Sequence, residues 1–195
     1  MGINKFIWIL IWAALLTTFG FGLITPIFAV FLTQQIQGGT LLVVGIAEMI
    51  YLGTKAIFQL PISLYLDKTP NERIDFYSMF LGGILIILVP FLYLFAQFPW
   101  QVFVLQFLHG LGAAFDWPAW MGLFTRHIDQ NRESFSWSLQ TTLEGAGLAL
   151  AAAIGGLVAD RFGFKPLFLF VGIFSTLTYL LLFIFYQKIK EELSG

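Results

Sequence analysis

The sequence of 195 residues contains no cysteine and few charged residues. Without cysteine the chain has no disulfide framework, no thiolate metal site and no cysteine nucleophile. Charged residues make up 11% of the chain, whereas soluble domains carry roughly 25%. The two histidines, His109 and His127, have no third ligand nearby, so no metal site is expected. No basic cluster points to nucleic acid, and the net charge of −1 is uninformative.

Apolar residues dominate the chain instead. Hydrophobic residues account for 58% of the sequence, and phenylalanine alone occurs 23 times. A soluble protein of this composition would expose large apolar patches. The composition therefore predicts an all-α integral membrane protein whose main partner is the lipid bilayer.

The apolar residues fall into six long segments. A helix that crosses the hydrocarbon core needs about 20 mainly apolar residues. The first segment is long enough to tilt or to extend beyond the membrane, and no A-x-A cleavage site follows it, which argues against a signal peptide. No linker is long enough to mark a second domain, so residues 1–195 are expected to form one domain. The predicted spans are 6–33, 42–66, 76–98, 100–124, 135–159 and 167–187.

Lysine and arginine predict the orientation, because cytoplasmic loops carry an excess of both. With an internal N-terminus, seven of these residues lie inside and two, Arg161 and Lys165, lie outside. We therefore expect a multi-pass protein of the cytoplasmic (inner) membrane with both termini in the cytoplasm. The inner set is Lys5, Lys68, Arg73, Arg126, Arg132, Lys188 and Lys190.

Four ionisable residues lie well inside the spans: Glu48, Lys55, Asp116 and Glu144. Each costs about 2.5–3.5 kcal/mol at a helix centre on insertion scales, so such residues rarely face lipid. Spans three and six carry no charge between residues 76 and 98 or between 167 and 187. Spans three and six can therefore face lipid, while spans two, four and five, at least, must share a polar interior.

Helical spacing extends each charged position into a polar stripe, because residues about seven apart lie on one helix face. Stripes on four spans predict a common cavity. A structural reading remains open for several members, since lone polar residues also join helices, threonines can bond their own backbone, and most aromatic residues pack. The stripes contain Glu48, Lys55 and Gln59; Gln106, His109, Asp116 and Trp120; Trp137, Gln140, Thr141 and Glu144; and Thr18 with Thr25.

The first and second halves of the chain also resemble each other in sequence. Residues 20–33 and 110–125 both begin G-x-G and both contain a proline, Pro26 or Pro118. The ends of spans two and five, LYLDKTPNER and LVADRFGFKP, each place an aspartate beside a basic residue. Because each unit has three spans, the second would be inverted relative to the first. We predict two inverted three-helix repeats, about 1–98 and about 99–195.

The segment GLVADRFGFK, residues 156–165, resembles the signature loop G-x-x-x-D-R-x-G-x-K of the major facilitator superfamily. The corresponding loop after span two is degenerate, with Ser63 and Pro70 in the glycine positions, although Asp67 and Lys68 are kept. The segment LHGLGAAFDWPAW resembles the fourth helix of the family, with His109 where arginine is common. Members of the family typically have twelve helices, so this chain looks like a half-length member, one half of a major-facilitator-type fold.

The resemblance implies a secondary transporter of a small organic solute that works by alternating access. The two halves of the family fold are related by an axis along the membrane normal, so two copies of this chain would form a parallel homodimer with the solute path between them. Two alternatives stay open: a subunit of a heteromeric transporter, and a membrane scaffold that has lost transport. An enzyme is not expected, because no nucleophile–base pair or metal cluster is evident, and a channel is disfavoured because no ring of pore charges is evident.

Roles follow for the polar residues, with protons as the expected coupling ion and no other cofactor. A carboxyl group in a low-dielectric cavity binds a proton more readily than one in water, which suits Asp116, Glu144 and Glu48. Lys55 either neutralises Glu48 or binds an anionic group of the solute. Expected solute contacts are Lys55, Gln59, His109, Trp117, Trp120, Trp137, Thr141 and Thr25. The expected gating residues are Asp67, Lys68, Arg73, Asp160, Arg161 and Lys165.

The family also implies how the gate would work. Its aspartate after span two docks on a helix N-terminus of the opposite half, where free N–H groups attract carboxylates. Here Asp67 would dock near Ser134 to Ser136 of the partner, and Asp160 would make an equivalent latch on the outer side. Ordinary helix capping and topology signalling are the alternative roles of both aspartates.

Overall fold

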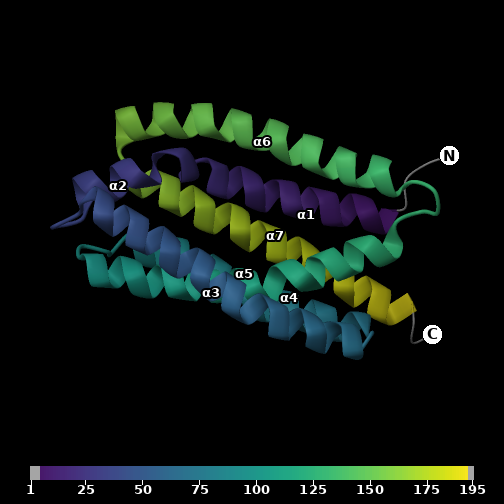
Figure 1. Ribbon diagram of the computed structural model, residues 1–195. Helices are drawn as coiled ribbons and strands as arrows, with labels where there is room; N and C mark the ends of the chain where they lie inside the picture. The colour runs from purple at the N-terminus through teal and green to yellow at the C-terminus, as the bar shows by residue number, and fades with distance from the viewer. Residues whose placement is uncertain (1–4, 193–195) are drawn as a thin grey trace.

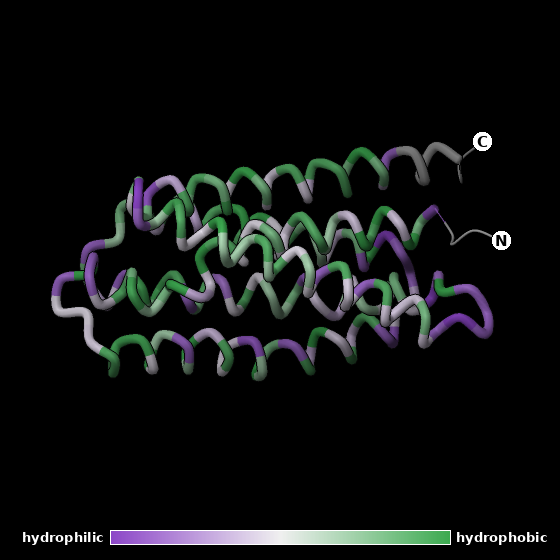
Figure 2. Tube along the Cα trace, turned by 90° about the horizontal axis from the view of Figure 1, so that it is seen from above, coloured by the Kyte–Doolittle hydropathy of each residue, from purple (hydrophilic) through white to green (hydrophobic). Residues whose placement is uncertain are grey.

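The protein is an elongated bundle of helices that run along its length (Figure 1). The computed structural model describes the backbone of residues 5–192 and the side chains of residues 5–187. The side chains of Lys188 and Lys190, used above for orientation, lie outside the described residues. The first helix begins and the last helix ends at the same end of the bundle. Hydrophilic segments gather at the two ends, and apolar residues dominate the lengths between them (Figure 2).

The predicted first span is not one continuous helix. It consists of α1 (Lys5–Gly22), a short 3₁₀ helix η1 (Thr25–Ile27) and α2 (Phe28–Gln35). The break coincides with Pro26, which has no N–H to donate and cannot sit inside a regular helix without cost. The Thr25 hydroxyl donates to the carbonyl of Phe21 at 2.8 Å. The predicted first span, 6–33, is therefore a helix that is broken in its C-terminal half.

The remaining helices begin and end close to the predicted boundaries. Thr40 caps α3 by accepting from the N–H of Val43 at 3.3 Å, and Asn71 caps α4 by accepting from the N–H of Arg73 at 3.0 Å. Gly163, at φ +77°, ends α6 in a conformation that favours glycine. The bounds are α3 Leu41–Lys68, α4 Glu72–Tyr93, α5 Pro99–His127, α6 Glu133–Phe162 and α7 Lys165–Glu192.

Five stretches of the described chain are long and apolar enough to cross a membrane: Lys5–Gln35, Leu41–Lys68, Glu72–Tyr93, Glu133–Phe162 and Lys165–Gln187. The helix α5 is not among them despite its 29 residues. Its polar side chains, including Gln106, His109 and Asp116, lower its mean hydropathy. The prediction of six spans therefore depends on α5 being shielded from lipid by its neighbours.

The helices pack as two groups joined along one side. In one group α1 contacts α6 and α7, and in the other α5 contacts α3 and α4. Contacts between α4 and α7 join the groups, while α6 and α3 lie at opposite edges in Figure 1. The helices α4 and α5 cross closely at Gly82 and Gly112, where an added Cβ on either residue would meet the backbone of the other helix.

The helices differ in how far their own chain encloses them. The charge-free spans three and six, α4 and α7, are the more enclosed, with 50% and 44% of their apolar windows buried. The charged spans two and five, α3 and α6, are only 11% and 17% buried. A helix without charge is free to face lipid, but it is equally suited to an apolar core, and in this chain α4 and α7 supply that core.

Candidate functional site

A cavity of about 440 Å³ lies between the two groups of helices. All four ionisable residues predicted to lie inside the membrane, Glu48, Lys55, Asp116 and Glu144, line it. Residues of every helix from α1 to α7 contribute to the wall, including the apolar helices α4 and α7. The volume is within the range of about 300–1,000 Å³ that is typical of small-molecule sites.

The carboxylate of Asp116 is held from the opposite group of helices. Asp116 lies on α5, and Tyr179 on α7 donates its hydroxyl hydrogen to the Asp116 Oδ1 at 2.8 Å. Both residues line the cavity. A hydrogen bond to a charged acceptor contributes more than one between neutral groups. This bond therefore fixes the carboxylate within the cavity wall.

Glu144 on α6 is held by the first helix. The Thr18 hydroxyl donates to Glu144 Oε1 at 3.3 Å. One residue earlier, Thr17 donates to the hydroxyl of Thr178 on α7 at 3.1 Å. Neighbouring threonines of α1 thus bond to two different helices, Thr18 to α6 and Thr17 to α7. The sequence predicted Thr18 as part of a polar stripe, and the structure places it in contact with an acid.

The third charged face belongs to α3, where Glu48, Tyr51 and Lys55 all line the cavity. The Lys55 Nζ lies 5.5 Å from the ring centre of Trp117 on α5, within the distance of a cation–π contact. No ion pair joins Lys55 to Glu48 in the described part of the chain. Glu48 is exposed at the edge of the bundle, whereas Lys55 is partly buried.

His109 lies between two aromatic rings from different helices. Its ring centre is 4.8 Å from that of Phe21 on α1 and 4.7 Å from that of Tyr51 on α3. The Phe21 and His109 planes are nearly parallel, at 11°. His109 thus combines a structural role, joining three helices, with a position in the cavity wall.

The structure brings most of the predicted solute contacts together. Lys55, His109, Trp117, Trp120 and Thr25 line the cavity with the three acids.

Three other predicted contacts, Gln59, Trp137 and Thr141, lie outside the cavity lining. Trp137 packs beside Trp120 and Phe124, with ring centres 6.2 and 4.8 Å away. The exposed Thr141 donates to the backbone carbonyl of Trp137 at 3.0 Å.

Sequence reasoning missed the tyrosines of the cavity: Tyr51, Tyr93 and Tyr179. Tyr51 had a usable signal, because it lies three residues after Glu48 and four before Lys55, on the same helix face. Tyr179 had none, since it sits in an otherwise apolar span and meets Asp116 across 63 residues of sequence. Only the packing of α7 against α4 and α1 places it there.

The predicted gating residues lie at the two ends of the bundle. Asp67 and Lys68 end α3 and Arg73 begins α4, while Asp160, Arg161 and Lys165 surround the junction of α6 and α7. All six are exposed, and none forms an ion pair within the described residues. Of the proposed docking positions, Ser136 is 3% exposed and is already covered by its own chain, whereas Ser134 is exposed.

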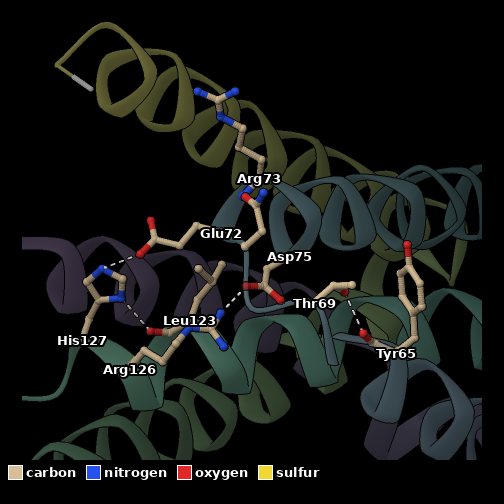
Figure 3. Close-up of polar contacts among 9 residues, drawn as sticks. Tyr65, Thr69, Glu72, Arg73, Asp75, Leu123, Arg126 and His127 are labelled. Carbon is tan, nitrogen blue, oxygen red and sulfur yellow. Dashed lines mark hydrogen bonds and ion pairs between the residues drawn. The ribbon is translucent and has the colours of Figure 1, made fainter. Parts of the chain in front are cut away.

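A polar cluster that the sequence did not reveal ties the start of α4 to the end of α5 (Figure 3). Arg126 pairs with Asp75, whose side chain is only 2% exposed. His127 Nε2 lies 3.4 Å from Glu72 Oε1, and its ring stacks on Phe6 at 3.7 Å between centres. Arg73, one of the predicted gating residues, points away from this cluster. Asp75 therefore pairs with Arg126 on α5 and not with Arg73, which is nearer in sequence and lies on α4.

The cavity offers carboxylates, hydroxyls and aromatic faces. Carboxylates can bind protons or cations, hydroxyls can donate or accept hydrogen bonds, and aromatic faces can bind apolar or cationic groups. Among the described residues, no group of three histidine, cysteine or acidic side chains is placed to hold a metal ion.

Comparison with known proteins points to one family. No curated protein sequence matches the chain. The sequence profile of the Major Facilitator Superfamily matches residues 10–194. This match, together with long apolar helices around a polar cavity, shows that the chain is an integral multi-pass membrane protein and belongs to the Major Facilitator Superfamily, a family of secondary transporters.

Proposed function

We propose that this protein transports a small organic solute by alternating access and couples the movement to protons. The observation that carries the proposal is the cavity that gathers Glu48, Lys55, Asp116 and Glu144 from three helices. Charged groups in a membrane-spanning region are costly and usually mark a solute or ion pathway. Here they converge on one space of suitable size.

Asp116 and Glu144 are the leading proton carriers in this proposal, with Glu48 as a third. Each of the first two is bonded to a hydroxyl group, of Tyr179 or Thr18. A hydroxyl can donate to a carboxylate or accept from a carboxylic acid. Such a partner can therefore serve both protonation states without a change of neighbour.

The solute would lie between the aromatic walls of the cavity. We assign its contacts to Trp117 and Trp120 on α5, to Lys55 on α3, to His109 and to Thr25. These residues come from both groups of helices, so a solute in the cavity bridges the groups. A change in the relative position of the two groups would change the contacts of the solute.

We further propose that the chain contains two inverted three-helix repeats and six spans. Exchange of α1 with α5, α3 with α6 and α4 with α7 turns the main contacts between these helices into one another. The contacts of α1 with α6 and α7 correspond to those of α5 with α3 and α4, and the α4–α7 contact maps onto itself. This correspondence supports a pseudo-two-fold axis, as in inverted-repeat transporters.

A second copy of the chain is the proposed cover for the exposed side of the cavity. Glu48 lines the cavity yet is exposed, and α3 and α6 are the least buried helices. Lipid against a carboxylate would be unfavourable, whereas a parallel homodimer would enclose it. With both termini in the cytoplasm of an inner-membrane protein, Asp67, Lys68 and Arg73 would gate the inner side, and Asp160, Arg161 and Lys165 the outer side.

Proteoliposomes that contain a pH-sensitive dye test the function. A thermal-shift screen with sugars, amino acids, nucleosides and organic cations first finds a stabilising solute, whose gradient is then imposed. The expected result is a solute-dependent pH change that Asp116→Asn and Glu144→Gln abolish. Glu133→Gln, an exposed acid on the same helix as Glu144, should leave it intact. Solute movement without a pH change in the native protein, or equal activity in all variants, would contradict the coupling.

Cysteine cross-linking tests the homodimer, because the native chain has no cysteine. Thr25→Cys places a thiol at the exposed rim of the cavity, and Ile84→Cys places one on the exposed face of α4. In native membranes a bifunctional reagent should join Thr25→Cys chains into dimers and leave Ile84→Cys chains monomeric. Equal yields, or no dimer from Thr25→Cys, would overturn the homodimer and favour a different partner chain.

A further inference from the structure

The cavity has an excess of negative charge that its own residues do not neutralise. Three carboxylates, of Glu48, Asp116 and Glu144, line it together with a single ammonium group, that of Lys55. Asp116 and Glu144 accept hydrogen bonds from neutral hydroxyls, and Lys55 lies over the face of Trp117. No ion pair within the described residues involves any of the four. A cationic occupant would therefore be favoured electrostatically.

The rest of the wall suits the body of an organic cation. Its surface is mostly apolar, and aromatic rings from several helices face the space. A positive charge beside an aromatic face is attracted to the ring, more strongly when water is excluded. The aromatic residues that line the cavity include Phe21, Phe28, Tyr51, Trp117, Trp120 and Phe168.

One further polar group of the wall has no partner. Tyr93 lines the cavity and is only 5% exposed. Its hydroxyl makes no hydrogen bond to any described residue. Its ring is fixed by Phe28 and Phe168, whose centres lie 5.6 and 5.1 Å away. Buried hydroxyl groups are usually satisfied, so this donor indicates an acceptor carried by the occupant.

We propose that the cavity binds an organic cation that has an apolar, partly aromatic body and one hydrogen-bond acceptor. This inference rests on the proposed function, because it takes the cavity as the solute site. An anionic solute would meet three carboxylates for each ammonium group. A sugar would leave most of its hydroxyl groups against apolar wall.

Binding of matched probes tests the charge. The protein is placed in nanodiscs of zwitterionic lipid, with empty nanodiscs as the background. Benzoylcholine carries a quaternary ammonium and an ester acceptor, 3,3-dimethylbutyl benzoate replaces the nitrogen by carbon, and 2-(benzoyloxy)ethanesulfonate carries a negative charge. Benzoylcholine should bind at least about tenfold more tightly than either, a difference of about 1.4 kcal/mol. Equal affinities, preference for the sulfonate or absence of benzoylcholine binding would overturn the proposal.

Variants test whether the preference arises in the cavity. Glu144→Gln and Asp116→Asn should each weaken benzoylcholine binding about fivefold or more and leave the neutral ester unaffected, since a close charge pair is worth about 1 kcal/mol or more. Glu133→Gln, an acid outside the cavity, should change neither affinity. Retention of the full preference in both cavity variants would overturn the assignment.

Tyr93→Phe tests the acceptor. It should weaken the binding of benzoylcholine about fivefold, the size of one hydrogen bond, but not that of (4-phenylbutyl)trimethylammonium, which has the same length and lacks the ester. Tyr186→Phe is the control, because Tyr186 is also buried but does not line the cavity. An equal effect of Tyr93→Phe on both cations would remove Tyr93 from the proposed site.

The outcomes separate this inference from the proposed function. Charge-selective binding without any solute-driven pH change would leave the cation site in place and contradict proton-coupled transport. A pH change driven by a neutral or anionic solute, with no preference for benzoylcholine, would support transport and overturn the cation site.

Discussion

The helices α4 and α7 differ from α3 and α6 in both charge and enclosure. Beyond Asp75, α4 has no charged residue, and α7 has none between residues 166 and 187, yet these two helices are about half buried by their own chain. The helices α3 and α6 carry Glu48, Lys55 and Glu144, yet are only 11% and 17% buried. The charged helices α3 and α6 therefore receive less shelter from the fold than α4 and α7.

The two pairs of helices are enclosed in different ways. Apolar α4 and α7 hold the chain together through close packing, as at Gly83, where an added Cβ would collide with the ring of Tyr179. The helices α3 and α6 present one charged face to the cavity and leave another face open. In our account, the open sides of α3 and α6 are completed by a second copy of the chain. Substitutions in the close-packed interior should therefore destabilise the protein more than substitutions on the open sides of α3 and α6.

Gly82→Val should have the largest effect. An added Cβ on Gly82 would collide with the Gly112 carbonyl and lie 2.8 Å from the backbone nitrogen of Asp116. Overpacking against backbone costs about 3 kcal/mol or more, so little folded protein should accumulate. Fluorescence-detected size-exclusion chromatography measures the folded yield. A normal monodisperse peak at native yield would show that α4 and α5 are not as close as described.

Arg126→Ala should destabilise the protein by about 3 kcal/mol, because it leaves the Asp75 carboxylate buried without its partner. The estimate is at the lower end of the usual range since Arg126 is 37% exposed. Thermal unfolding in detergent measures the change. Asp75→Asn with Arg126→Ala should recover part of the loss, and a single variant as stable as the native protein would contradict a structural role for the pair.

Tyr179→Phe should cost about 1.5 kcal/mol, because it removes the hydrogen bond to Asp116 and leaves the aromatic packing unchanged. The same unfolding assay applies. In an Asp116→Asn background the further effect of Tyr179→Phe should be smaller, which a double-mutant cycle resolves. Additive effects of the two changes would show that the hydroxyl and the carboxylate do not interact.

Gly53→Ala should have the smallest effect, within about 0.5 kcal/mol of the native protein or slightly stabilising, since alanine is the better helix former. Gly53 lies on α3, and nothing in the chain is within 4 Å of an added Cβ. Thermal unfolding of the detergent-solubilised monomer measures this change in stability. A loss as large as that of Gly82→Val would show that the open side of α3 packs against the chain itself.

The sequence predicts the helices and the charged part of the cavity well, because both depend on local patterns. Helical spacing places Glu48 and Lys55 on one face and Asp116 near Trp120, and these residues line one cavity in the structure. The break near Pro26 was less predictable, since Pro61, Pro90 and Pro118 lie inside helices that continue.

Contacts across the bundle were the part that local patterns could not predict. Tyr179 reaches Asp116, and Arg126 pairs with Asp75, only because particular helices become neighbours. Absence of charge also proved ambiguous. It allows lipid contact for α4 and α7, but an apolar helix satisfies the requirements of a core equally well.

The central claim is that a water-accessible chamber, not lipid, surrounds the charged residues. Since the native chain lacks cysteine, Ala113→Cys in the cavity wall and Ile84→Cys on the outer face of α4 can be compared directly. A membrane-impermeant, water-soluble methanethiosulfonate reagent reacts with ionised thiols, which require water. In sealed proteoliposomes we predict labelling of Ala113→Cys and protection of Ile84→Cys. An unreactive thiol at residue 113, or equal labelling at residue 84, would contradict the chamber.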